Sequence, residues 1–370
     1  MFERICKGVL FSFVVLVSCS VWATAAEPPA LARLSGVEKE RVAKLIEGAK
    51  KEKELAGYSN ILRPEIQASL IPVFRKEYGL SESDLQLKII STRSTAVITK
   101  VEEELQAKVY KTDLIQNGTI GWFNDLAGKG ELMAYDSPEY KQFHPLATDP
   151  KIAPANPPYF IATFFGPFGI AYNYKLIKGE IKNWKDVLRP EFKGKICAAD
   201  VSKSMSYVDA YLAMLNVVGK SFFEELAKQN PFLLVSASDL VNKCVTGEFP
   251  IVVMSEAGNP GRAILRGGDL KIVFPPEGFA NVGYPMAILA RAPHPNAAKL
   301  FMDFMHSKGG QEIIFKDCQS VARLGITSSS DYPKPAYEMK GVIPMDWRKI
   351  TAQDRLNAQE EFGKMMGAKK

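Results

Sequence analysis

Residues 283–305 read GYPMAILARAPHPNAAKLFMDFM, and no other stretch of the chain is as informative about the fold. The first eight residues form a short apolar run, which predicts a strand that ends before two prolines. Pro295 stands where a helix is expected to begin. Apolar residues then recur on one helical face: Ala297, Leu300, Phe301, Phe304 and Met305. Gly309 and Gly310 are expected to close this helix in the left-handed conformation that glycine adopts easily.

The same succession of strands and helices runs through the rest of the chain. Short apolar runs predict strands at 55–58, 87–90, 113–115, 168–172, 195–200 and 251–254. Periodic apolar positions predict helices at 37–53, 66–78 and 207–218, at a short segment 184–188, and after residue 95. Because strands alternate with helices, we expect an α/β fold with largely parallel sheets.

The N-terminal 26 residues have the features of an export signal. Arg4 and Lys7 precede an apolar run, and the small residues 23–25 offer a cleavage site. The run is short for a membrane span, which needs about 20 apolar residues. A second interpretation remains open, because residues 16–19 resemble a lipobox that would leave a lipid anchor on Cys19. Either cleavage predicts a protein of the periplasm.

Charge and cysteine content narrow the range of functions. The leader holds one acidic and two basic residues, so its removal lowers the net charge only from +6 to +5. This mild excess, without a run of Lys and Arg, favours a small anionic ligand over nucleic acid. Cys197, Cys244 and Cys318 remain after cleavage. One disulfide with an odd thiol is one interpretation, and three small buried side chains is the other.

Three stretches of the chain resemble periplasmic solute-binding proteins of ABC importers, in the group that contains ferric-ion, phosphonate and phosphorylated-sugar binders. They are the strand, helix and "kGGQeii" continuation of 283–314, the segment "NykLikgeiknWkDvLrPeFkGKIcaaD" at 173–200, and the entry at 50–58. Their order and spacing carry the resemblance. It implies a two-lobed periplasmic-binding-protein fold of type II with a ligand cleft between the lobes. It also implies an inner-membrane ABC permease as partner and a protein that acts as a monomer.

The resemblance further implies that the chain crosses between the lobes twice. The crossings are expected near 164–168 and 281–285. Lobe 1 would then comprise residues 27–163 and 286–370, and lobe 2 residues 164–285. We expect each lobe to have a sheet of its own.

The strongest candidate for ligand binding is the loop Thr92-Arg93-Ser94-Thr95, which follows one strand and opens a helix. Ligands of open α/β sheets lie beyond the carboxyl ends of strands, where helix N-termini favour anions. The hydroxyl groups can donate hydrogen bonds, and Arg93 can grip a carboxylate or phosphate with two parallel bonds. The alternative is simple capping of the helix, with Arg93 in solvent.

Further candidates follow other strands and complete the predicted binding site: Tyr58, Ser59, Asn60, Ser204, Ser206, Glu256 and Arg262. Arg262 would be a second cationic clamp, with a surface salt bridge as the alternative. Ser204 and Ser206 lie where a helix cap would also lie.

A ferric-ion binder is the alternative within the same fold, and an exported α/β enzyme is the alternative outside it. Ferric members of the family carry adjacent tyrosines in the second lobe, whereas the corresponding loop 255–262 has none. The three histidines lack metal-ligand spacing, and no catalytic or nucleotide-binding motif is present. We therefore expect neither a metal nor a cofactor, and no catalytic residue.

Overall fold

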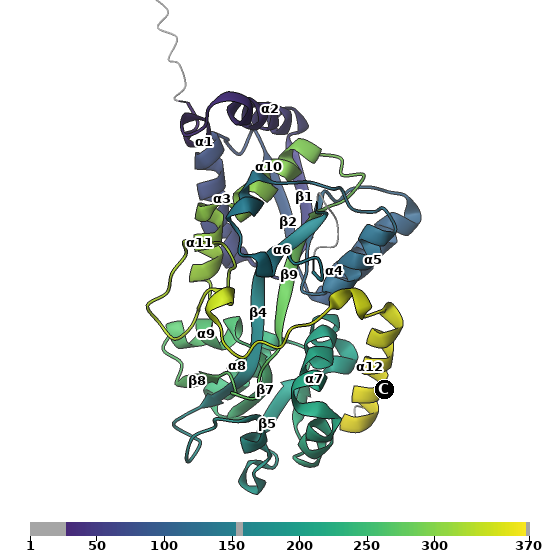
Figure 1. The fold of residues 1–370 in the computed structure, drawn as a ribbon, viewed down its shortest axis with the longest axis vertical. Coiled ribbons are helices and arrows are strands. Elements are labelled where there is room, and N and C mark those ends of the chain that lie inside the picture. Colours follow the sequence, from purple (N-terminus) through teal and green to yellow (C-terminus); the bar gives the residue numbers. More distant parts are fainter. Residues whose placement is uncertain (1–26, 153–157, 368–370) are drawn as a thin grey trace, which may run out of the picture.

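The computed structural model describes residues 27–152 and 158–367. The expected leader, with Cys19, lies outside these residues. Figure 1 shows two lobes stacked along the long axis of the molecule, with the N-terminal elements at one end. Among the described residues, none of the helices has both the length and the apolar character that a membrane span requires.

The sheet of lobe 1 contains three parallel strands and the last residues of a fourth strand, which runs antiparallel to them. β1 (Glu54–Ser59) pairs in parallel with β2 (Gln86–Ser91) and with β3 (Leu114–Gln116). β3 in turn pairs with β9 (Asn281–Ile288) in the antiparallel sense. The helices between them are α2 (Gly36–Glu52), α3 (Pro64–Tyr78), α4 (Ser94–Ala107) and α5 (Ile120–Gly128).

Two further helices of lobe 1 follow β9 in the sequence. α10 (Pro295–His306) packs against α2, and α11 (Lys308–Lys316) packs against α3. The predicted closure at Gly309 and Gly310 is wrong, because both glycines lie inside α11. The break falls at Ser307, whose backbone is extended and whose hydroxyl accepts from the Gly310 N–H at 3.2 Å. A Cβ on Gly310 would overlap the Phe304 carbonyl oxygen, so glycine is needed there for close approach.

Lobe 2 repeats the arrangement on a second group of strands. β5 (Ile196–Ala199) lies between β6 (Phe232–Leu234) and β7 (Ile251–Glu256), with both pairings parallel. Helices α8 (Ala237–Thr246) and α9 (Gly258–Leu265) follow β6 and β7. α7 (Met205–Lys228) is interrupted at Gly219, whose φ of 72° is left-handed. The predicted helix 207–218 is therefore only the first part of this element.

The two lobes are joined by two long strands. β4 (Phe160–Asn173) pairs with β9 from Phe160 to Pro167, and its last residues pair with β7 and with β8 (Leu270–Val273). All fourteen residues of β4 are buried. At about 3.3 Å per residue, such a strand is long enough to extend through both lobes. Hydrogen bonds thus connect the nine described strands in one sheet, in the order β2-β1-β3-β9-β4-β7-β5-β6 with β8 paired to β4 beside this path, which corrects the expectation of a separate sheet in each lobe.

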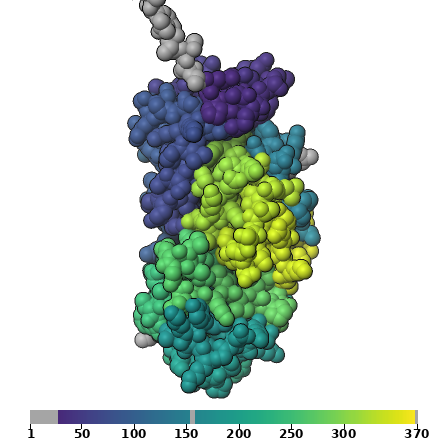
Figure 2. Space-filling view, turned by 90° about the vertical axis from the view of Figure 1, so that its left-hand side faces the viewer, coloured from purple at the N-terminus to yellow at the C-terminus, as the bar shows by residue number. Residues whose placement is uncertain are grey.

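The C-terminal segment passes from lobe 1 to lobe 2. Its helix α12 (Ala352–Met366) packs against α7, although the predicted division assigns residues 286–370 to lobe 1. Figure 2 shows the segment after α11 lying across the junction of the lobes. The exact lobe boundaries stay a prediction. The remaining elements are short: α1 (Pro29–Ala32), η1 (Pro138–Gln142), α6 (Pro145–Thr148), η2 (Trp184–Leu188), η3 (Pro190–Phe192), η4 (Val201–Lys203), η5 (Ala336–Glu338) and η6 (Trp347–Lys349).

The three cysteines of the described chain are free and buried, so the disulfide interpretation is not supported. Burial raises the pKa of Cys197 to about 12 and that of Cys318 to about 11. A thiolate is the reactive form of cysteine. These side chains therefore pack as small, unreactive apolar groups.

Candidate ligand-binding cleft

A cleft of about 780 Å³ lies between the lobes. Residues at the N-terminal ends of five helices line it: Arg63 of α3, Arg93 of α4, Ser204 of α7, Ser236 of α8 and Asn259 of α9. The N-terminal end of α9 is capped by Glu256, which accepts from the Gly258 N–H at 2.8 Å. α3, α4 and α7, in contrast, have no side-chain hydrogen bond from their N-cap residues. Their first backbone N–H groups and their dipoles consequently favour negative charge in the cleft.

Nearly all the predicted site residues line this cleft. They are Asn60, Thr92, Arg93, Ser94, Thr95, Ser204, Ser206, Glu256 and Arg262. Tyr58 and Ser59 are not among the lining residues. The Ser59 hydroxyl is used inside lobe 1, where it donates to Gln116 Oε1 at 2.6 Å and accepts from the N–H of Leu62 at 2.8 Å. That the lining residues bind the ligand stays a prediction.

The loop before α4 presents a cation that has no ion-pair partner among the described residues, beside free backbone donors. Arg93 is the N-cap residue, with an extended backbone and an exposed side chain. Within residues 27–152 and 158–367, no carboxylate lies at ion-pair distance from its guanidinium group. Ser94 is buried, and its hydroxyl donates to Asn117 Oδ1 at 2.6 Å. Ser94 therefore offers its backbone N–H to the cleft, whereas exposed Thr95 has a hydroxyl to offer.

The facing loop of lobe 2 supplies hydroxyl groups at the start of α7. The Ser204 and Ser206 oxygens lie 3.4 Å apart, and neither caps the helix. Tyr207 is buried beside them, and its ring meets that of Phe168 edge to face. Burial raises the pKa of Tyr207, and of Tyr284 across the cleft, so both phenols are neutral at physiological pH.

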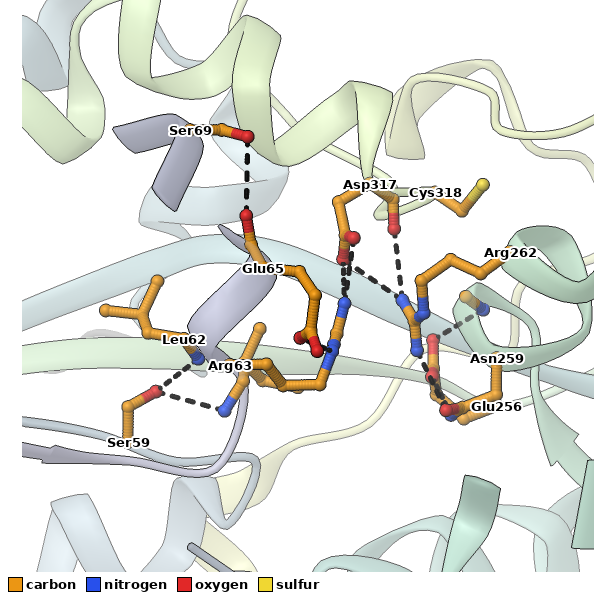
Figure 3. Close-up of polar contacts among 12 residues, drawn as sticks. Ser59, Leu62, Arg63, Glu65, Ser69, Glu256, Asn259, Arg262, Asp317 and Cys318 are labelled. Carbon is orange, nitrogen blue, oxygen red and sulfur yellow. Dashed lines mark hydrogen bonds and ion pairs between the residues drawn. The ribbon is translucent and has the colours of Figure 1, made fainter. Parts of the chain in front are cut away.

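A second group of charges contains Arg63, Glu256 and Arg262, which line the cleft, and Asp317, and Figure 3 shows their polar contacts. Asp317 accepts hydrogen bonds from Arg63 at 2.7 Å and from Arg262 at 3.1 Å. Glu256 is buried and accepts from the Gly258 N–H and from Asn259 Nδ2, each at 2.8 Å. Burial raises the pKa of Glu256, and the positive charges of Arg262 and Arg63 oppose that rise. The positive charges of the two arginines are thus offset by the negative charges of the two carboxylates.

Several lining residues were not predicted from the sequence, and a common signal identifies some of them. Arg63, like Arg93, is an N-cap residue in the stretch between a parallel strand and the next helix. Ser236 and Ser238 stand at the start of α8 after β6, a strand of three residues that is too short and exposed to stand out as an apolar run. Polar residues between a strand and a helix N-terminus are the signal in each case.

The fold and the site together define a two-lobed binding protein with a cleft between its lobes. Residues 63–312 match the family model for bacterial extracellular solute-binding proteins, and the chain belongs to this family. The expected family and fold class are therefore confirmed. Proteins of this family are extracytoplasmic, bind small solutes and interact with ABC permeases; they are transport proteins and not enzymes.

Known proteins with similar sequences or structures cover most of the chain. An uncharacterized protein of Haemophilus influenzae is 26% identical over 299 residues, which are 76% of this chain and 83% of that protein. The periplasmic binding protein AfuA from Actinobacillus pleuropneumoniae, solved with bound fructose-6-phosphate, has a TM-score of 0.72 at 22% identity, covering 86% of this chain and all of AfuA. Iron-bound HitA from Pseudomonas aeruginosa has a TM-score of 0.67 at 17% identity, covering 84% of this chain and 99% of HitA.

Proposed function

We propose that this protein captures a small anionic organic solute, carrying a phosphate, phosphonate or carboxylate group, in the cleft between its lobes. It then delivers the solute to an inner-membrane ABC permease and acts as a monomer in the periplasm. The observation that carries the proposal is Arg93, which has no ion-pair partner among the described residues, at the uncapped N-terminus of α4, with the uncapped N-terminus of α7 facing it. A guanidinium group beside free backbone N–H groups is suited to bind an oxyanion.

The size of the cleft supports an organic solute over a bare inorganic anion. At about 30 Å³ for each water, a cleft of 780 Å³ has the volume of roughly 25 water molecules. Phe168, Tyr207 and Tyr284 supply aromatic surface, and Asn60, Asn259 and Glu256 supply hydrogen-bonding groups. A ligand with one anionic group and a polar or partly apolar body would contact both the aromatic residues and the hydrogen-bonding residues of the cleft.

The ferric-ion alternative has less support in this cleft. A ferric ion needs anionic oxygen ligands, and phenolate is the form of tyrosine that binds it. Tyr207 and Tyr284 line the cleft, but burial raises the pKa of each phenol. Among the described residues, no group of three or more His, Cys, Asp and Glu side chains is placed to hold a metal ion.

A thermal-shift screen followed by calorimetry tests the proposal. The probes are fructose 6-phosphate, 2-aminoethylphosphonate, citrate and ferric citrate, with fructose as the uncharged control. A ligand at a hundredfold excess over its Kd stabilises the folded state by about 2.7 kcal/mol. We expect at least one organic anion to raise the Tm while fructose does not. Stabilisation by ferric citrate alone, with ferric absorption in the visible range, would replace the proposal by the iron alternative, and no response to any anion would refute it.

A further inference from the structure

Asp317 joins two arginines that come from different lobes. It follows α11 directly, and its two carboxylate oxygens accept from Arg63 Nη2 at 2.8 and 2.7 Å. The same carboxylate accepts from Arg262 Nη1 at 3.1 Å, and the Asp317 main-chain carbonyl accepts from that nitrogen at 3.0 Å. Figure 3 shows Asp317 between the two guanidinium groups. Arg63 stands before α3 of lobe 1, whereas Arg262 lies on α9 of lobe 2.

The group is partly shielded from water, which strengthens its charge interactions. The side chains of Arg262, Asp317 and Arg63 are 14%, 17% and 29% exposed. Two further hydrogen bonds extend this group. Arg262 Nη2 donates to Asn259 Oδ1 at 2.8 Å, and Asn259 Nδ2 donates to Glu256 at 2.8 Å. Two neighbouring guanidinium groups repel each other, so a carboxylate between them is what allows both to stay in place.

The contact lies beside the strands that connect the lobes. The side chain of Cys318 approaches α9 so closely that a Cβ on Gly261 would lie 3.0 Å from Cys318 Cβ. Ser320, just beyond, forms a β-bridge with Phe165 of β4. In a hinge motion, the displacement of one lobe relative to the other is smallest near the connecting segments. The Asp317 contacts are therefore placed to persist while the outer parts of the lobes move.

We propose that Asp317 is a positioning residue that ties α9 of lobe 2 to α11 of lobe 1 and holds Arg63 and Arg262 as a pair of oriented guanidinium groups in the cleft. The role of the pair in anion binding rests on the proposed function, whereas the tie itself does not. Both arginines line the cleft and keep N–H groups that Asp317 does not use. Holding long side chains in the binding geometry lowers the entropy cost of capturing the anion.

The tie is tested first in the protein without ligand. Asp317→Asn and Arg262→Gln are combined in a double-mutant cycle of denaturant unfolding, and amide hydrogen exchange is followed in α9. We expect non-additive free energies of unfolding and faster exchange in α9 of Asp317→Asn, with partial recovery in Asp317→Glu. Glu131→Gln is the matched control, because it breaks the 2.7 Å pair of Glu131 with Arg291 inside lobe 1. Additive free energies together with unchanged exchange in α9 would overturn the tie.

The positioning role is tested by calorimetry with fructose 6-phosphate, 2-aminoethylphosphonate and citrate. For an anion that the wild type binds, Asp317→Asn should weaken binding about tenfold, which corresponds to roughly 1.4 kcal/mol, and Asp317→Glu should recover part of it. Unchanged affinity in Asp317→Asn would overturn positioning and leave a purely structural tie. A wild type that binds none of the anions would refute the proposed function and with it the positioning role, while the ligand-free cycle still decides whether the tie exists.

Discussion

Arg93 and Arg262 show how the surroundings of an arginine decide what it can bind. Arg262 is held by Asp317 and Asn259, so much of its hydrogen-bonding capacity is used inside the protein. A cationic clamp and a surface salt bridge were the two predictions for Arg262, and its salt bridge with Asp317 is not a surface pair, because the two side chains are only 14% and 17% exposed. Arg93 has an exposed side chain at an uncapped helix end. Among the described arginines that line the cleft, Arg93 therefore has the most N–H groups available to a ligand.

Replacing Arg93 by Ala should weaken anion binding by about one to two orders of magnitude, because a hydrogen bond to a charged group contributes ~1.5–3 kcal/mol. The fold should be unaffected, since the side chain is exposed. Arg93→Lys should recover only part of the affinity, because an ammonium group lacks the two parallel donors. Calorimetry with the anion found in the screen measures this, and Arg348→Ala, on a surface pair with Asp346, is the control. Wild-type affinity in Arg93→Ala would mean that Arg93 is a solvated surface residue.

His306 makes stability depend on pH. It is fully buried at the end of α10, where its Nδ1 lies 2.8 Å from the Met302 carbonyl and its Nε2 3.1 Å from the Thr163 hydroxyl. A neutral ring that donates from Nδ1 and accepts at Nε2 satisfies both contacts. Burial lowers the pKa of His306 to about 4. In the unfolded chain the histidine therefore takes up a proton near pH 6.5, whereas in the folded chain His306 is protonated only near pH 4.

The contribution of His306 to the free energy of unfolding should consequently be fully present above pH 6.5. It should decrease as the pH falls toward 4, by at most roughly 3 kcal/mol. Urea unfolding between pH 4 and 7 measures the slope. His306→Gln should have a flatter profile in this range than the wild type. Identical slopes in wild type and His306→Gln would show that other groups cause the acid sensitivity.

At the scale of elements, α5 of lobe 1 is joined to α7 and α12 by one arginine. Arg355 of α12 is 2% exposed and donates to Asp209 of α7 at 3.1 Å. Its Nη1 lies 3.6 Å from Asp125 of α5. Desolvation raises the pKa of Asp209, and the charge of Arg355 opposes that rise. The helix α5 passes so close that a Cβ on Gly121 would overlap the Arg355 guanidinium.

Gly121→Ala should therefore displace Arg355 and leave Asp209 buried without its partner. Loss of one member of a buried ion pair costs about 3–5 kcal/mol, so we expect a large fall in the free energy of unfolding. Gly128→Ala, in the same helix but with nothing within 4 Å of the added Cβ, is the control and should be close to neutral. A loss in Gly121→Ala no larger than in Gly128→Ala would mean that Arg355 moves aside without cost.

The elements that were predicted correctly are those whose local pattern is decisive. β1, β2 and β7 follow from apolar runs, and the Arg93 loop follows from polar residues between a strand and a helix. The length of β4 was missed, because Gly166 and Pro167 interrupt its apolar residues even though its whole length is buried. Asp317 was missed for another reason: it lies 254 residues from Arg63 in sequence, and only the folded chain brings them together. No local pattern contains such a contact.

At the scale of the whole molecule, the apolar core follows the connections between the lobes and does not divide at the cleft. One buried cluster contains Val97 of α4, Phe160 of β4, Tyr211 of α7 and Phe362 of α12, and so extends through both lobes. A second cluster is centred on α2, α3 and α10 of lobe 1. The cleft is thus flanked by connected, densely packed elements. Lobe motion is then expected to be a hinge movement with little repacking inside either lobe.

Closure of this kind should make the protein more compact when the ligand binds. Exclusion of water strengthens each charge-assisted hydrogen bond to the anion, so the closed arrangement gains most from the helix ends of both lobes. Small-angle scattering with saturating anion should give a smaller radius of gyration than the ligand-free protein, and the forward scattering should correspond to a monomer. Arg93→Ala binds about one to two orders of magnitude more weakly, so it should need a correspondingly higher anion concentration to reach the same compaction. If calorimetry shows saturation while the radius of gyration of the wild type is unchanged, the lobes do not close on the anion, and the cleft must be regarded as a preformed, rigid site.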